Sequence, residues 1–312
     1  MLQRALPGTD LELSVVGMGC WPIGGKHWGA IDDEESIAAI RRAVEVGIDW
    51  FDTAPLYGDG HADRILRKAL GERIGEVTIA TKVGAVRDPA TDEAWSDLSP
   101  ANVRADCHQS LERLGVERID LLQVHWPCER GTPIAETIGA LEALREEGAI
   151  RHWGLCNYDG GALEAALAVA PVPSLQTPYS LVRRDADEGL LSLCREREVG
   201  VLAYETLCRG LLTGKFGGSP PRFGPNDMRA HDPRFWGGRF LRIASVAQAL
   251  DAAATKVGAP TSALAVGWTL SRPGIHAAVV GAKTPAQVEA NARAGALVPH
   301  ERLWAAIDRM LR

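Results

Sequence analysis

Six short apolar segments of this sequence end on, or lead directly to, side chains that could do chemistry. In chain order these side chains are Asp52, Tyr57, Lys82, His125, Cys156, Asn157, Gln176 and Tyr204. One polar residue after a strand is commonly a turn residue, and one histidine is commonly a satisfied core residue. Six such segments in succession indicate a shared site, provided that the fold brings their ends to one rim.

Asp52, Tyr57, Lys82 and His125 together suit the protonation of an oxygen atom. A phenol has an ordinary pKa of ~10, and we expect the Lys82 ammonium to lower the pKa of Tyr57 by favouring the phenolate. Asp52 would keep that ammonium charged and in place. His125 could orient a carbonyl oxygen while negative charge develops on it. Hydride addition to a carbonyl creates such a charge, and the hydride must come from a cofactor.

The scaffold that positions these residues is predicted by alternating strand-like and helical patterns. Strands are expected at residues 15–17, 49–53, 77–82, 119–125, 150–155, 174–177, 200–204 and 277–280. Helices are expected at residues 34–46, 63–70, 101–114, 134–147, 161–169, 187–198, 242–257, 261–270, 286–294 and 301–311. This alternation favours parallel strand pairing through right-handed crossovers.

The predicted fold class is α/β, a (β/α)8 TIM barrel that occupies residues 1–312 as a single domain. Eight βα units over about 250 residues match such a barrel. Residues 208–241, rich in Gly, Pro, Arg and Phe, are expected to form a long loop after the seventh strand. A doubly wound dinucleotide fold is rejected, because the segment 17–22 lacks the third glycine and the first helix starts only near residue 34.

Composition excludes several classes of partner. The chain has 312 residues, is 46% apolar and carries a net charge of −6, so no basic surface for nucleic acid or anionic lipid is expected. Neither an apolar run long enough for a membrane span nor a signal peptide is recognised. The six cysteines form no Cys-x-x-Cys pair, so neither a disulfide framework nor a metal site is predicted. We expect a cytoplasmic protein with reduced thiols, and a monomer by default.

The segments 51–58, 80–82 and 121–125 resemble three signature stretches of the aldo-keto reductase superfamily. The resemblance extends in family order from Gly17 to Lys283. It implies that Tyr57 is the general acid in reduction and the base in oxidation, tuned by Lys82 and Asp52. It also implies NADPH as cofactor, with NADH possible, and small aldehydes, ketones or sugars as substrates.

The same resemblance implies which residues bind the cofactor. The nicotinamide end would be met by Cys156, Asn157 and Gln176, and Tyr204 would supply either an aromatic ring or a pyrophosphate contact. The pyrophosphate would be met by Leu207, Arg209 and Gly210, and the adenosine phosphate end by Gly281, Lys283, Gln287 and Asn291. The segment 207–215 would contribute backbone amides and positive charge. Lys283 precedes a helix start, which makes it the expected contact of the 2′-phosphate.

Several positions depart from the family pattern. Cys156 stands where serine is usual, and a thiol is a weaker hydrogen-bond partner. Glu205 replaces a serine near the expected pyrophosphate and would oppose it unless Arg209 or Lys215 compensates. Asp63 shortens a usual glutamate. These departures bear on cofactor affinity and leave the proton-transfer residues untouched.

The substrate pocket is expected to have aromatic walls. Trp21 and Trp126 should overhang the nicotinamide and accept many small carbonyl compounds. The long loop carries Arg222, Arg229, Arg234 and Arg239. It would form either a lid that meets a polar or anionic substrate or a solvated, partly mobile loop.

Two other functions remain open from the sequence. One is a Schiff-base lyase or aldolase that uses Lys82 as nucleophile. The other is an NADPH-binding sensor or regulatory subunit with little turnover.

Overall fold

Eight parallel strands close into a barrel in the computed structural model, which describes residues 1–88, 91 and 93–311. Around the barrel the strands are β3 (Val16–Gly19), β4 (Trp50–Asp52), β5 (Thr78–Val83), β8 (Ile119–Val124), β9 (Ile150–Cys156), β10 (Ser174–Pro178), β11 (Gly200–Tyr204) and β12 (Ile275–Gly281). Pairing of β12 with β3 completes the ring. The predicted (β/α)8 barrel is confirmed, and every expected strand overlaps an observed one.

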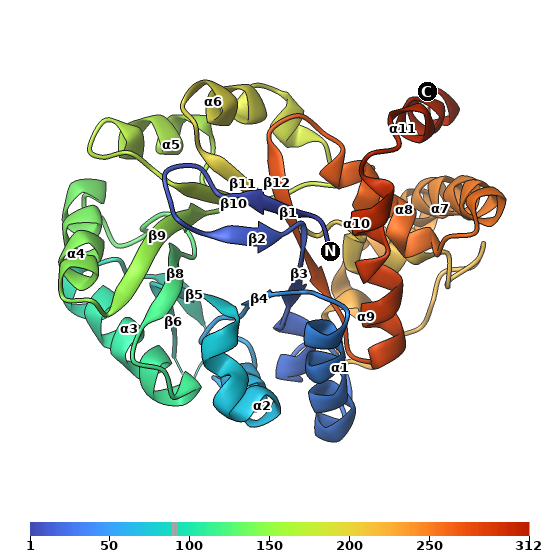
Figure 1. Cartoon of the computed structure of the whole chain (residues 1–312). Coiled ribbons are helices and arrows are strands. Elements are labelled where there is room, and N and C mark those ends of the chain that lie inside the picture. Colours follow the sequence, from blue (N-terminus) through green and yellow to red (C-terminus); the bar gives the residue numbers. More distant parts are fainter. Residues whose placement is uncertain (89–90, 92, 312) are drawn as a thin grey trace.

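Helices surround the barrel on its outer face (Figure 1). They are α1 (Asp33–Glu45), α2 (His61–Leu70), α3 (Pro100–Leu114), α4 (Ile134–Glu146), α5 (Gly160–Leu167), α6 (Leu190–Glu196), α7 (Gly237–Val257), α8 (Thr261–Leu270), α9 (Pro285–Ala292), α10 (Ala294–Leu297) and α11 (Glu301–Met310). Local caps start several of them: the side chains of Asp32, Asp159 and Thr284 each accept a hydrogen bond from a first-turn backbone N–H. No helix within the described residues is long and apolar enough to cross a membrane.

A hairpin that the sequence did not predict lies across one mouth of the barrel (Figure 1). Its strands are β1 (Gln3–Ala5) and β2 (Glu12–Ser14). Leu6, Leu11 and Leu13 pack there against interior side chains of the barrel, including Trp50 and Leu121. Because β2 leads directly into β3, this closed mouth is the one at the amino ends of the strands. The strand carboxyl ends, where barrel enzymes hold their sites, lie at the other mouth.

Some expected helix boundaries were wrong for local reasons. The helix expected at 187–198 begins only at Leu190, because Gly189 has a φ of 105°. The helix expected at 242–257 begins earlier, at Gly237, although two glycines open it. The helix expected at 286–294 ends at Ala292. A second unpredicted hairpin, β6 (Ala85–Arg87) with β7 (Ala94–Ser96), follows β5.

The long loop after β11 is packed onto the barrel rim. It contains the 3-10 turns η4 (Cys208–Thr213), η5 (Met228–His231) and η6 (Pro233–Phe235). Asp227 forms an isolated bridge with Trp28, and the backbone N–H of Met228 donates to His27 O at 2.9 Å. Within the loop, the rings of Phe216, Phe223 and Phe235 meet edge to face. These contacts anchor parts of the loop on the rim, while most of residues 217–226 are exposed.

Candidate active site

The predicted proton-transfer residues meet at the carboxyl ends of β4 and β5. The Lys82 ammonium donates to Asp52 Oδ1 at 2.6 Å and to the Tyr57 hydroxyl at 3.2 Å. It also donates to the carbonyl of Thr53 at 3.0 Å. Lys82 and Asp52 are 1% and 2% exposed, so both charges are removed from water and paired with each other.

The turn that carries Tyr57 packs directly on η1 (Trp21–Gly24). Gly58 has a φ of 66°, and a Cβ there would lie 1.9 Å from the carbonyl oxygen of Gly24. Only glycine therefore fits position 58 without moving the Tyr57 backbone. Asp63, the shortened acid of α2, accepts from Thr53 Oγ1 at 2.7 Å and from Arg113 Nε at 2.9 Å. This buried pair holds the residue whose carbonyl accepts from Lys82.

The electrostatics of the group correct one expectation from the sequence. Burial raises the pKa of Tyr57 above its ordinary value, and the opposing effect of Lys82 does not outweigh it. Burial alone would lower the pKa of Lys82, but Asp52 and Tyr57 raise it overall. Burial, reinforced by Lys82, holds the pKa of His125 well below its usual range. At neutral pH the phenol is protonated, the lysine is charged and the imidazole is neutral.

Aromatic rings line the approach to this group. Trp21 stacks on Tyr57 with ring centroids 6.1 Å apart, and Trp126 stacks on His125 at 3.7 Å. Tyr57 and His125 meet edge to face at 6.2 Å. Trp126 is 40% exposed, whereas His125 is buried and its Nδ1 has no hydrogen-bond partner within the described residues. The two predicted wall residues thus contact the two side chains expected to meet a substrate oxygen.

Sequence reasoning missed Gln123, which belongs to the same buried network. Asp52 Oδ2 accepts from Gln176 Nε2 at 2.8 Å and from Gln123 Nε2 at 3.2 Å. Gln176 Nε2 also donates to Gln123 Oε1 at 3.3 Å. Alternate residues of a strand share a face, so the position of Gln123 two residues before His125 was a usable signal.

The side chains predicted for the nicotinamide end are brought together and bonded to one another. Asn157 Nδ2 donates to the carbonyl of His125 at 2.9 Å, and its Oδ1 accepts from the Tyr204 hydroxyl at 2.6 Å. The Cys156 thiol donates to Gln176 Oε1 at 3.7 Å. Burial raises the pKa of Cys156 to about 12, so this thiol stays protonated at neutral pH.

Positive charge gathers at the end predicted for the adenosine phosphate. Arg229 pairs with Asp227, and Lys283 Nζ donates to the carbonyl of Trp28 at 2.8 Å. Burial, followed by Arg229 and Lys283, lowers the pKa of Lys215, and burial followed by Arg229 lowers that of Lys283. Three cations therefore lie within electrostatic reach of one another, with one carboxylate among them.

Two residues predicted for the adenosine are also placed by α9. Gln287 is exposed, and its Oε1 accepts from the backbone N–H of Lys283 at 2.9 Å. Asn291 lies one turn further along the helix and is buried. The two side chains therefore differ in their access to a ligand.

Three arginines neutralise the carboxylate of Glu205. It is 6% exposed and accepts hydrogen bonds from Arg183, Arg209 and Arg234. Asp232 bridges Arg209 and Arg234 from the other side. Arg209 provides the predicted compensation, and Arg183 and Arg234 were not foreseen in this role. Leu207 directly precedes η4, and Gly210 follows Arg209 within it with a φ of 92°.

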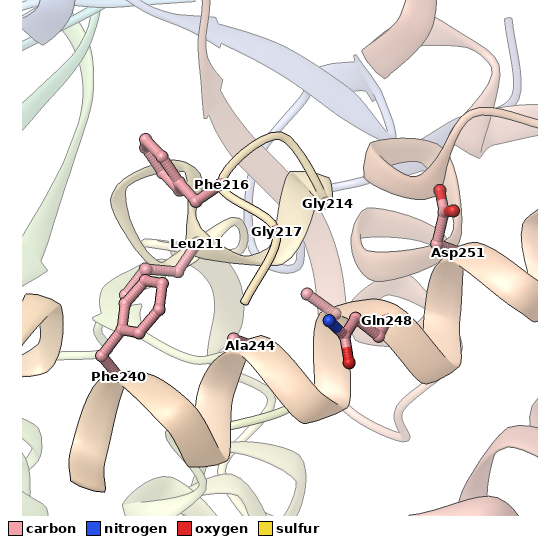
Figure 2. A pocket seen from close by; sticks show the side chains of 9 residues that line it. Leu211, Gly214, Phe216, Gly217, Phe240, Ala244, Gln248 and Asp251 are labelled. Carbon is pink, nitrogen blue, oxygen red and sulfur yellow. The ribbon is translucent and has the colours of Figure 1, made fainter. Parts of the chain in front are cut away.

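A small cavity of about 100 Å³ lies between η4 and the middle of α7 (Figure 2). Leu211, Phe216 and Phe240 form its apolar wall, and Gln248 and Asp251 face it from the helix. Asp251 accepts from Thr261 Oγ1 at 2.6 Å, so its carboxylate is already engaged. None of the residues predicted for catalysis lines this cavity.

Comparison with known proteins agrees with this geometry. The model of the aldo/keto reductase family matches residues 15–312. The chain belongs to the aldo/keto reductase family. It is 38% identical over 293 residues to an aldo-keto reductase of Bacillus subtilis, covering 93% of this chain and 87% of the relative.

An NADH-specific methylglyoxal reductase of Escherichia coli is 32% identical over 307 residues, covering 94% of this chain and 93% of the relative. The structure of a glycerol dehydrogenase from Gluconobacter oxydans superposes with a TM-score of 0.89 at 35% identity. That match covers 99% of this chain and 94% of the other. The family resemblance read from the motifs is thereby confirmed.

The residues of this aldo/keto reductase fit a phosphate-bearing nicotinamide cofactor. Lys215, Arg229 and Lys283 carry more positive charge than Asp227 neutralises. Within the described residues, Thr206 Oγ1 and Trp28 Nε1 are buried without a hydrogen-bond partner. Buried hydrogen-bond donors in proteins normally have an acceptor, and the oxygens of a bound dinucleotide would supply acceptors for these two.

Proposed function

We propose that this protein transfers hydride between NADP(H) and the carbonyl or alcohol group of small aldehydes, ketones or sugars. The observation that carries the proposal is the buried Lys82 ammonium, which contacts both Asp52 and the Tyr57 hydroxyl. The neutral His125 lies beside this group. Such an arrangement gives a protonated phenol, a fixed positive charge next to it and a neutral donor for an oxygen.

In reduction Tyr57 is the general acid. The nicotinamide, when bound, supplies the hydride. Tyr57 gives its proton to the substrate oxygen as negative charge develops there, and the Lys82 ammonium stabilises the phenolate that remains. Asp52 keeps Lys82 charged, and an N–H of the neutral His125 ring orients the oxygen. In oxidation the same phenolate takes the proton of the alcohol.

The cofactor would extend from the β9–β11 ends to the start of α9. Cys156, Asn157, Gln176 and Tyr204 would meet the nicotinamide, Leu207, Arg209 and Gly210 the pyrophosphate, and Gly281, Lys283, Gln287 and Asn291 the adenosine end. The excess of cations around Asp227 supports NADPH, because only NADPH carries a 2′-phosphate. NADH is a second candidate, since one relative is an NADH-specific reductase.

Trp21 and Trp126 would hold the substrate. Their rings cover Tyr57 and His125 with apolar surface, which suits small carbonyl compounds that carry few charges. The relatives named for glycerol and methylglyoxal act on small oxygenated molecules of this kind. We further propose that residues 1–312 form one domain, active in the cytoplasm and as a monomer.

The test is NADPH consumption by the purified protein with a reactive aromatic aldehyde, with NADH in parallel. Turnover with either cofactor is expected. Tight NADPH binding without turnover on any small carbonyl would contradict the reductase and indicate the sensor subunit. A Schiff-base lyase is disfavoured, because Asp52 keeps Lys82 charged and an ammonium is no nucleophile.

A further inference from the structure

An open groove of about 670 Å³ lies at the rim formed by the carboxyl ends of the strands. None of the residues proposed for catalysis or cofactor binding lines it. One side is formed by the loop that follows β10, and the other by the start of α7. Four arginines line it, namely Arg183, Arg234, Arg239 and Arg242, together with the single carboxylate of Asp185. Lys215, Arg229 and Lys283, the cations of the proposed adenosine phosphate end, are absent from its lining.

The four arginines fall into two pairs. Arg183 and Arg234 both donate to Glu205, which neutralises part of their charge. Arg239 and Arg242 are exposed, and in the part of the chain that the structure describes neither has a hydrogen-bond or ion-pair partner. The groove therefore presents two uncompensated guanidinium groups beside two that are already anchored.

The position of Arg239 and Arg242 is electrostatically unfavourable for the fold itself. They are the third and sixth residues of α7, near the end of the helix where the dipole is positive. The first turn of α7 holds no acidic residue, and Trp236 at the N-cap accepts no hydrogen bond through its side chain. Residues three apart also share a helix face, so the two cations repel each other. Violations of local preference without a compensating contact point to a binding role.

We propose that this groove binds the phosphate group of a small phosphorylated molecule. A guanidinium group can donate two parallel hydrogen bonds to the oxygens of one phosphate, so Arg239 and Arg242 offer several donors on the α7 side of the groove. A bound phosphate would neutralise the charges of Arg239 and Arg242. Its negative charge would also interact favourably with the positive end of the α7 dipole. The volume of the groove falls within the range of small-molecule sites, ~300–1,000 Å³. It therefore has room for the sugar as well as the phosphate of a sugar phosphate.

Calorimetric titration of the full chain tests the site at constant ionic strength, with glucose 6-phosphate, inorganic phosphate and uncharged glucose as probes. The wild type is compared with the double variant Arg239→Gln/Arg242→Gln. The matched control is Arg302→Gln/Arg309→Gln, which removes the same charge from two exposed positions of α11. Each titration is repeated with saturating NADPH, because the cofactor site could itself take a phosphate.

We expect glucose 6-phosphate to bind the wild type and the α11 control equally, and the double variant at least ten-fold more weakly, whether or not NADPH is present. Glucose should not bind. Binding of inorganic phosphate alone, lost in the double variant, would support the site and restrict it to the free ion.

Equal affinity for all three proteins, or displacement of the sugar phosphate by NADPH, would overturn the proposal. If the double variant fails to fold, the single variant Arg242→Gln decides the same question. The titrations without cofactor need no enzymatic turnover, so they stand or fall separately from the proposed reductase activity.

Discussion

Gln123 donates a hydrogen bond at 3.2 Å to Asp52, on the carboxylate oxygen that Lys82 does not contact. Gln176 donates to the same oxygen from the next strand but one along the chain. The carboxylate thus has an ammonium on one oxygen and two amides on the other, all of them buried. We interpret Gln123 as a positioning residue that acts on Tyr57 only through Asp52 and Lys82.

Replacement of Gln123 by leucine should lower kcat about ten-fold, roughly the effect of one lost hydrogen bond to a charged group. KM and the Kd for NADPH should change little, because Gln123 is expected to touch neither substrate nor cofactor. Thr81→Val is the control, since Thr81 is buried on β5 and its hydroxyl has no partner within the described residues. Unchanged kcat in Gln123→Leu would remove Gln123 from the network that supports proton transfer.

The pH dependence of reduction should follow the raised pKa of Tyr57 and the lowered pKa of His125. Because the phenol stays protonated beyond its ordinary value of ~10, kcat should stay level as pH rises from about 7 to about 9. The imidazole is neutral across this range, so no inflection near ~6.5 is expected. Steady-state rates at saturating cofactor check this, and a decline of kcat centred between about pH 7 and 8 would be incompatible with the proposed protonation states.

Lys283→Ala should weaken the binding of NADPH more than the binding of NADH, because only NADPH carries the 2′-phosphate. The ratio of the two Kd values should change about ten-fold. Lys283 also donates to the carbonyl of Trp28, so the substitution will disturb the segment around Trp28 as well. That disturbance should weaken the binding of both cofactors equally. Fluorescence titration with each cofactor separates the two effects. Lys256→Ala, an exposed lysine at the end of α7, provides the control. Equal weakening of both cofactors would rule out Lys283 as the 2′-phosphate contact.

Glu205→Gln should destabilise the protein by about 2 kcal/mol at pH 7, less than for a fully buried pair because its arginine partners are partly exposed. Burial raises the pKa of Glu205, but Arg234, Arg209 and Arg183 hold it below its ordinary value overall. A carboxylate whose pKa is lower in the folded than in the unfolded protein stabilises the fold at pH values above its unfolded pKa. This stabilisation is lost as the pH falls through the folded pKa.

The difference between wild type and Glu205→Gln should therefore be full at pH 7 and shrink below about pH 4.5. Urea unfolding at several pH values measures it. A difference that stays constant down to pH 3 would mean that the charge of Glu205 contributes nothing to stability.

The barrel and the proton-transfer residues were predictable because both depend on patterns of residues close together in the sequence. Apolar runs that end on Asp52, Lys82 and His125 specify strands and a shared rim at once. Their meeting then follows from parallel pairing alone. The family motifs lie on these same strand ends, so the two lines of reasoning reached the same residues.

What the sequence did not predict depends on contacts between distant segments. Nothing near Glu205 in the chain indicates that Arg183 and Arg234 converge on it, because that depends on how two loops fold back over the rim. The hairpin of β1 and β2 is too short to show a strand period, and its leucines become meaningful only against Trp50 and Leu121. The net pKa of Tyr57 depends on its burial, which no residue pattern states.

In the proposed mechanism the Tyr57 hydroxyl carries the proton. The decisive measurement compares kcat and the NADPH Kd of wild type and Tyr57→Phe, a change that removes one oxygen and keeps the ring that stacks on Trp21. We predict a loss of kcat of ~10²-fold or more with a nearly unchanged Kd, the range expected for removal of a general acid. A Tyr57→Phe variant that keeps near-normal turnover would show that another group donates the proton.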